Sequence, residues 1–132
     1  MEINPPVKIK VLEVEGKGRG VVATEDINEG EIIEYCPIVF ITKEEAEFFE
    51  KGKTVLNFYY MQQPEINQVC LMLGYGCIYN HSQTPNAEVD YDTASPKDFL
   101  YFKALRKISA GEEIVYDYQF DNNKEEFLQD AK

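Results

Sequence analysis

Three short segments hold the residues whose types and spacing could do chemistry. They read GKGRG at residues 16–20, YNHSQTPN at 79–86 and GEEIVYDY at 111–118. In the first segment, Gly18 and Gly20 let the backbone approach a ligand closely, because no Cβ stands in the way. The second is dense in polar and aromatic groups, and the third ends in a pair of tyrosines. These segments are the candidates for binding and catalysis.

Several common kinds of site are excluded. His81 is the only histidine, so a multi-histidine metal site cannot form. No serine has the surroundings of a nucleophile elbow, and the glycine loop lacks the GK[ST] ending of a Walker A loop. Glu112 and Glu113 are adjacent, and adjacent side chains on a strand point to opposite faces. We therefore interpret them as turn and structural groups and not as paired catalytic carboxylates.

In this order and at these separations, the three segments resemble the SET-domain protein lysine methyltransferases. The resemblance covers roughly residues 8–120. It implies a mainly β SET-domain (β-clip) fold of small curved sheets with short helices and a C-terminal pseudoknot. It also implies transfer of a methyl group from S-adenosylmethionine to a lysine amine of a basic protein such as a histone.

The resemblance further implies how the cofactor is held. The backbone of residues 17–19 would cradle the methionine end of S-adenosylmethionine, Asn80 would bind its amino-acid part, and backbone groups of His81 would bind the adenine. From the residues alone, plainer interpretations stay open: a tight turn for the glycine loop, and a self-bonded turn for Asn80. The candidate cofactor-binding residues are Lys17, Gly18, Arg19, Tyr79, Asn80 and His81.

Three tyrosines are the candidate catalytic residues. By resemblance, Tyr118 would orient the lysine amine and the transferring methyl. Tyr116 would sit where Phe or Tyr sets how many methyl groups are added, and a tyrosine there favours mono-methylation. Tyr35, in Glu34-Tyr35-Cys36, would line the lysine channel, although Pro37-Ile38 replaces the expected Gly-Glu. Without the other motifs, packing in a sheet is the commoner fate of tyrosines in strands.

These residue types suit methyl transfer to an amine. Lysine must be neutral to attack, yet its free pKa is about 10.4. Burial in an aromatic channel and a nearby sulfonium both disfavour its charged form, so no carboxylate base is required and the proton can leave through water. Most of the acceleration then comes from alignment of donor and acceptor.

One departure from the family pattern affects how the site is closed. Many members carry a zinc-binding, cysteine-rich segment after the Tyr-Asp-Tyr motif, whereas the last cysteine here is Cys77. Phe120 and Phe127 in the tail, or a second subunit in a homodimer, would have to cover the pocket instead. The minimal layout resembles the small stand-alone SET proteins of bacteria and viruses.

Two other functions stay open. One is a binding module on the same β-clip scaffold that has no turnover, against which the intact Asn80-His81 and Tyr118 argue. The other is methylation of a non-histone basic protein, for example a ribosomal one. Binding and consumption of S-adenosylmethionine separate the module from the enzyme, and candidate basic proteins separate the two enzymes.

The elements that must position these residues are marked by a repeat. Residues 23–35 read ATEDINEGEIIEY and residues 104–116 read ALRKISAGEEIVY, with Ala, Ile, Gly, Glu, Ile and Tyr coinciding. Each copy predicts one hairpin, with an apolar strand, a tight Gly-Glu turn and a second strand. Two equivalent hairpins predict a β-rich domain with internal pseudo-symmetry.

Other patterns place the remaining elements. Thr42 with Glu45 is a capping-box pattern and predicts a short helix that ends before Gly52, with Phe48 and Phe49 on its buried side. Strands are predicted over 7–14, 87–91 and 99–104. We expect one domain over residues 1–132, with a core at about 8–120 and a charged tail, 121–132, that forms a short helix or a frayed end.

Composition and net charge limit which kinds of molecule could bind this protein. The 132 residues carry 13 basic and 24 acidic side chains, a net charge of −11, which disfavours direct nucleic-acid binding and suits a basic protein or peptide. No signal peptide or membrane span is predicted. Three cysteines form no disulfide framework and no C-x2-C pair, so we expect a reducing compartment and no metal site. The protein is predicted to be intracellular: cytoplasmic in a prokaryote, and nuclear or chromatin-associated in a eukaryote or virus.

Overall fold

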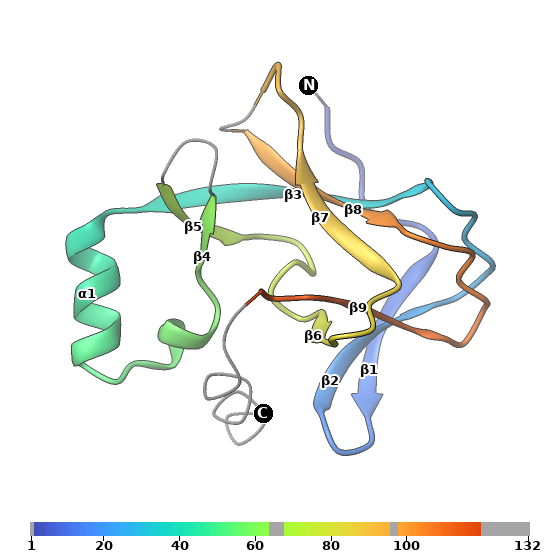
Figure 1. The fold of residues 1–132 in the computed structure, drawn as a ribbon, viewed down its shortest axis with the longest axis horizontal. Coiled ribbons are helices and arrows are strands. Elements are labelled where there is room, and N and C mark those ends of the chain that lie inside the picture. Colours follow the sequence, from blue (N-terminus) through green and yellow to red (C-terminus); the bar gives the residue numbers. More distant parts are fainter. Residues whose placement is uncertain (1, 64–67, 96–97, 120–132) are drawn as a thin grey trace.

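The computed structural model describes residues 2–63, 68–95 and 98–119, which form two small sheets and little helix (Figure 1). One sheet has the strand order β1-β2-β9-β6, and the other has the order β4-β5-β3-β8-β7. The elements are β1 (Ile9–Val14), β2 (Gly18–Ala23), β3 (Ile32–Ile41), α1 (Lys43–Lys51), the 3-10 helix η1 (Val55–Phe58), β4 (Met61–Gln63), β5 (Gln68–Met72), β6 (Asn80–His81), β7 (Ala87–Tyr91), β8 (Phe99–Ala104) and β9 (Glu113–Tyr116).

The prediction that each repeat copy folds as its own hairpin is wrong. The two strands of one copy pair with the strands of the other copy: β2 pairs with β9, and β3 pairs with β8, both antiparallel. Between these pairs, Ile27 and Ile108 form an isolated antiparallel bridge. The two copies are therefore interlocked, and the internal pseudo-symmetry survives as an exchange of strands.

The backbone hydrogen bonds of the two copies repeat this exchange. Ile27 N–H donates to the Ile108 carbonyl at 2.8 Å, and Ile108 N–H donates back at 2.8 Å. The turn glycines show the same exchange. The Gly30 N–H donates to the Ala104 carbonyl and the Gly111 N–H donates to the Ala23 carbonyl, both at 2.8 Å, and each alanine ends the first strand of the other copy. Gly30 and Gly111 have φ of +81° and +89°, a backbone region that glycine enters without steric cost.

The capping-box helix is confirmed. The Thr42 side chain accepts from Glu45 N–H, the Glu45 side chain accepts from Thr42 N–H, and α1 ends at its cap residue Gly52. The prediction for its buried side was wrong for Phe48, which is 67% exposed, whereas Phe49 is half-buried. Ala46 is the residue of α1 that is buried.

The strands predicted at 87–91 and 99–104 are confirmed as β7 and β8, and the first strand begins at Ile9. Figure 1 shows α1 at the left and the β1–β2 hairpin at the lower right, with β6 and β9 between them. β6 lies parallel to β9, with Asn80 opposite Val115 and His81 opposite Tyr116. The tail, with Phe120 and Phe127, lies outside the described residues. No helix in the described ranges is long and apolar enough to cross a membrane.

The two copies cross at the bridge between Ile27 and Ile108, and we expect the stability of the fold to be most sensitive to mutation there. Ile27 and Ile108 are both fully buried, so Ile108→Ala should lower the free energy of unfolding by about 2–5 kcal/mol through lost burial and a residual cavity. Denaturant unfolding measures the change. Leu105→Ala, at a side chain that is 41% exposed, is the matched control and should change it by under about 1 kcal/mol. Equal effects of the two variants would contradict the assignment of the crossing point.

Candidate active site

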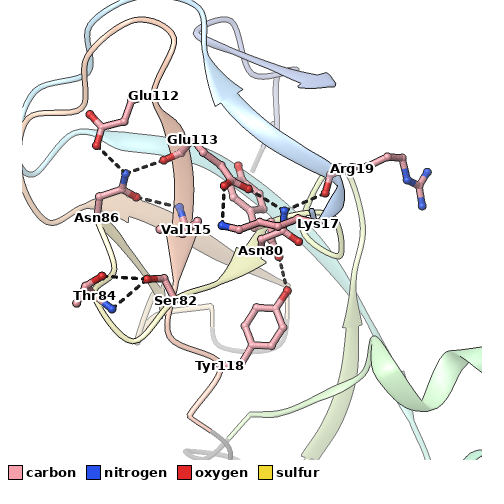
Figure 2. A network of polar contacts seen from close by, with 11 residues as sticks. Lys17, Arg19, Asn80, Ser82, Thr84, Asn86, Glu112, Glu113, Val115 and Tyr118 are labelled. Carbon is pink, nitrogen blue, oxygen red and sulfur yellow. Dashed lines mark hydrogen bonds and ion pairs between the residues drawn. The ribbon is translucent and has the colours of Figure 1, made fainter. Parts of the chain in front are cut away.

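The glycine loop and the Asn80 segment meet at one carboxylate (Figure 2). Asn80 Nδ2 donates to the Arg19 carbonyl at 2.9 Å and to Glu113 Oε2 at 2.7 Å. Lys17 Nζ lies 2.8 Å from Glu113 Oε1 and completes the network. The three segments singled out in the sequence are therefore adjacent in space.

Glycine is needed where these segments touch. A Cβ on Gly20 would come within 2.6 Å of Glu113 Oε2 and 2.9 Å of Asn80 Nδ2, closer than real Cβ contacts allow. Gly18, at the start of β2, has φ +79°, so the loop turns in a conformation that side chains rarely adopt. The backbone of residues 17–19 is thereby brought against Asn80.

Tyr118 is hydrogen-bonded to the residues on either side of Asn80. Its hydroxyl donates a short hydrogen bond to the Tyr79 carbonyl, and its backbone N–H donates to His81 Nδ1 at 3.0 Å. The rings of His81 and Tyr118 are 5.1 Å apart, centroid to centroid. The chain on either side of Asn80 is thus tied to the tyrosine that the sequence singled out.

Tyr116 belongs to an aromatic cluster formed by Tyr79, Phe102, Tyr116 and Tyr118. The Tyr116 and Tyr118 ring centroids are 4.7 Å apart, and Tyr79 stacks on Phe102 at 3.8 Å. Burial raises the pKa of the Tyr116 hydroxyl and that of the Tyr118 hydroxyl above their ordinary values. Both phenols are therefore protonated at neutral pH.

The structure does not bring Tyr35 to this cluster. Its ring contacts Phe99 at 5.3 Å and Tyr101 at 6.0 Å, two residues on the same face of β8. Phe102, which packs on Tyr79, lies on the opposite face. Cys36, the next residue after Tyr35, is buried and belongs to the same core cluster as Tyr79 and Tyr116.

A β-bulge explains this placement. The register of β3 against β8 shifts between Ile32 and Glu34, so β3 carries one extra residue there. A one-residue shift moves every following side chain to the other face. Tyr35 and Tyr116 coincide in the repeat, but the bulge sends Tyr35 away from the face that Tyr116 occupies.

Asn86 fixes the loop after β6 to β9. It is 2% exposed, its Oδ1 accepts from Val115 N–H at 2.9 Å, and its Nδ2 donates to the Glu113 carbonyl at 2.8 Å (Figure 2). Within the same loop, Ser82 and Thr84 are hydrogen-bonded to each other. The Asn-His-Ser…Pro-Asn segment is therefore held at both ends, by Asn80 and by Asn86.

Sequence reasoning interpreted Glu113 only as a turn or structural group. In the structure its carboxylate joins Lys17 to Asn80, whereas Glu112 binds Arg106 and the Ser109 N–H. The repeat held a signal for this difference, since Glu112 coincides with Glu31 but Glu113 coincides with an isoleucine. Within the described residues, no group of three His, Cys, Asp or Glu side chains could hold a metal ion.

Comparison with known proteins agrees with this geometry. The SET domain family model matches residues 18–119. A Schizosaccharomyces pombe protein named histone-lysine N-methyltransferase, H3 lysine-37 specific, is 36% identical over 117 residues, which cover 88% of this chain and 75% of that protein. An N-lysine methyltransferase of Xenopus laevis is 32% identical over 120 residues, which cover 83% of this chain but 36% of that protein.

A solved structure is also similar. The crystal structure of a Plasmodium falciparum protein, described as a candidate histone methyltransferase, has a TM-score of 0.68 and 32% identity over 86% of this chain and 99% of that one. The chain therefore belongs to the SET-domain family, and its mainly β fold is the fold of that family. By this membership it is a protein-lysine N-methyltransferase.

The Glu112 carboxylate should make the free energy of unfolding depend on pH in the acid range. Hydrogen bonds from Arg106, Ser109 and Asn86 lower its pKa from 4.5 to about 2. Because the folded pKa lies below the unfolded one, this stabilisation is complete above about pH 4.5 and is lost as the pH falls towards about 2. Glu112→Gln should therefore flatten the fall of the unfolding free energy over that range, measured by urea titration at each pH. An unchanged slope would contradict the assignment.

Proposed function

We propose that this enzyme transfers a methyl group from S-adenosylmethionine to a lysine side chain of a basic protein, with a histone as the first candidate substrate. The observation that carries the proposal is the convergence of the residue 17–19 backbone and Asn80 beside the Tyr118 hydroxyl. A methyl donor and a lysine acceptor need such neighbouring sites, because most of the acceleration comes from their alignment.

The residues fit the cofactor. The amino-acid end of S-adenosylmethionine carries both an ammonium and a carboxylate, and the loop with Asn80 offers backbone groups and a side-chain amide at one point. The close approach at Gly20 leaves no room for a Cβ, so the loop backbone packs directly against Asn80 and Glu113. Lys17, Gly18, Arg19, Tyr79, Asn80 and His81 would hold the cofactor, which supplies a methyl on a sulfonium when bound.

The tyrosines would orient the substrate and not act as bases. Burial keeps Tyr116 and Tyr118 protonated, so each hydroxyl can donate or accept a hydrogen bond but holds no negative charge. Burial in the aromatic cluster would also favour the neutral lysine amine that attacks, since desolvation disfavours a charged ammonium. The Tyr116 hydroxyl would restrict room around the amine, which favours mono-methylation.

The charge of the chain supports a basic substrate. At −11, the protein attracts lysine- and arginine-rich segments and repels nucleic-acid backbones. The fission yeast relative is named as specific for histone H3, and a histone substrate would place this enzyme at chromatin in a nucleated cell. A non-histone basic protein has the same charge complementarity and is an outcome of the test below.

The test has two stages. Isothermal titration with S-adenosylhomocysteine measures cofactor binding, and a radiolabelled methyl-transfer assay on a histone mixture measures catalysis. Binding with transfer supports the proposal, and mass spectrometry of the product then gives the lysine and the methyl count. Binding without transfer to histones redirects the proposal to other basic proteins. Absence of binding would leave a β-clip module without turnover as the better function.

Two variants separate the predicted roles. Tyr118→Phe should keep affinity for S-adenosylhomocysteine within about twofold and lower kcat by about 10²-fold, because the hydroxyl aligns the amine. Asn80→Ala should instead weaken that affinity by about tenfold, the loss of roughly 1.4 kcal/mol of hydrogen bonding. Tyr101→Phe, on the other face of β8, is the control and should match the wild type. Full activity of Tyr118→Phe would remove Tyr118 from its role.

Salt should weaken substrate binding. Attraction between the acidic enzyme and a basic peptide is screened as ionic strength rises, since the Debye length falls from about 10 Å at 0.1 M to about 3 Å at 1 M. We expect KM for a lysine-rich peptide to rise with salt while affinity for S-adenosylhomocysteine changes little. A peptide with the same target lysine but neutral flanks is the control. A KM for the basic peptide that is independent of salt would contradict charge recognition.

A further inference from the structure

Glu34 is a buried carboxylate outside the residues assigned so far. It is 4% exposed, and its two oxygens accept separate hydrogen bonds. The Tyr79 hydroxyl donates to Oε1 at 2.7 Å, and the Tyr75 N–H donates to Oε2 at 2.9 Å. The side chain therefore joins β3 to the 74–79 segment that leads into Asn80.

The local backbone is built around this carboxylate. The β-bulge between Ile32 and Glu34 lets Ile33 and Glu34 both face inward. Across from it, Gly74 has φ +66°, and a Cβ there would lie 2.5 Å from Glu34 Oε2. Both the strand and the facing turn thus accommodate the Glu34 side chain.

The charged form of Glu34 is disfavoured at this buried position. Burial raises the pKa of the Glu34 carboxyl, which means that desolvation of its charge outweighs the bonds from Tyr75 and Tyr79. Val115 coincides with Glu34 in the second repeat copy, but the bulge turns Glu34 to the other face, so the two side chains do not share the same surroundings. The hydrogen bonds from Tyr79 and Tyr75 are what the carboxylate supplies at this position.

Those bonds lead directly to Tyr118. Tyr79 is fully buried, with its ring stacked on Phe102 and its hydroxyl held by Glu34. Its backbone carbonyl accepts the hydrogen bond from the Tyr118 hydroxyl. We propose that Glu34 is a positioning residue for methyl transfer: by holding Tyr79 and the 74–79 segment, it fixes the carbonyl that orients the Tyr118 hydroxyl. The inference rests on the function proposed above.

The test uses Glu34→Gln, Tyr79→Phe and the double variant. Glutamine keeps the shape and one acceptor for Tyr75 but offers an amide to the Tyr79 hydroxyl, whereas phenylalanine removes that hydroxyl and leaves the carbonyl. Each single variant should lower kcat by about tenfold or more, with affinity for S-adenosylhomocysteine within about twofold. The double variant should be no slower than the slower single, because both remove one interaction. Glu31→Gln, a surface carboxylate of the same repeat copy, should retain the wild-type kcat.

A readout independent of activity accompanies the kinetics. With ¹³C-labelled tyrosine, the ring Cζ resonance of Tyr118, assigned through Tyr118→Phe, should shift in Glu34→Gln and Tyr79→Phe but not in Glu31→Gln. Loss of folding in Glu34→Gln leaves Tyr79→Phe as the test. Wild-type kcat and an unshifted resonance in folded variants would overturn the inference, as would additive losses in the double variant. Absence of transfer by the wild type would instead refute the proposed function, and the inference would fall with it.

Discussion

The reciprocal pairing of Ile27 with Ile108 is the constraint on which the rest of the fold depends. Each donates its backbone N–H to the carbonyl of the other, and both side chains are fully buried. Because the two repeat copies cross here, the first strand of each copy pairs with the second strand of the other. That exchange places β9 beside both β2 and β6, and so brings the glycine loop to Asn80.

The site arises where the two copies stop being alike. Glu113 in the second copy coincides with Ile32 in the first, and Glu34 in the first coincides with Val115 in the second. Each of these carboxylates anchors part of the segment that leads to β6: Glu113 binds the Asn80 amide, and Glu34 binds Tyr79. The symmetric scaffold thus supplies stability, while the two positions at which the copies differ carry the carboxylates that hold the polar groups in place.

The sequence predicted what depends on local pattern. The Thr42 capping box predicted α1, the segments between turns and loops predicted β7 and β8, and the motif segments predicted the groups that meet at Asn80. Strand partners were predicted wrongly, because an apolar strand, turn and strand look alike whether the strands pair with each other or with a second copy. The position of Tyr35 depends on a single-residue bulge, which leaves no mark in a pattern of residue types.

Protonation links the aromatic cluster to the proposed reaction. Burial is the largest cause of the raised pKa at Tyr79, Tyr116 and Tyr118, and the same burial would disfavour an ammonium placed among them. In the proposed reaction, the burial that raises the pKa of these phenols would also favour the neutral form of the acceptor amine. Orientation must then come from hydrogen bonds, and the Tyr118 hydroxyl has its direction set by the Tyr79 carbonyl. Control of the proposed reaction would then lie in how rigidly the 74–79 segment is held, which is the role we propose for Glu34.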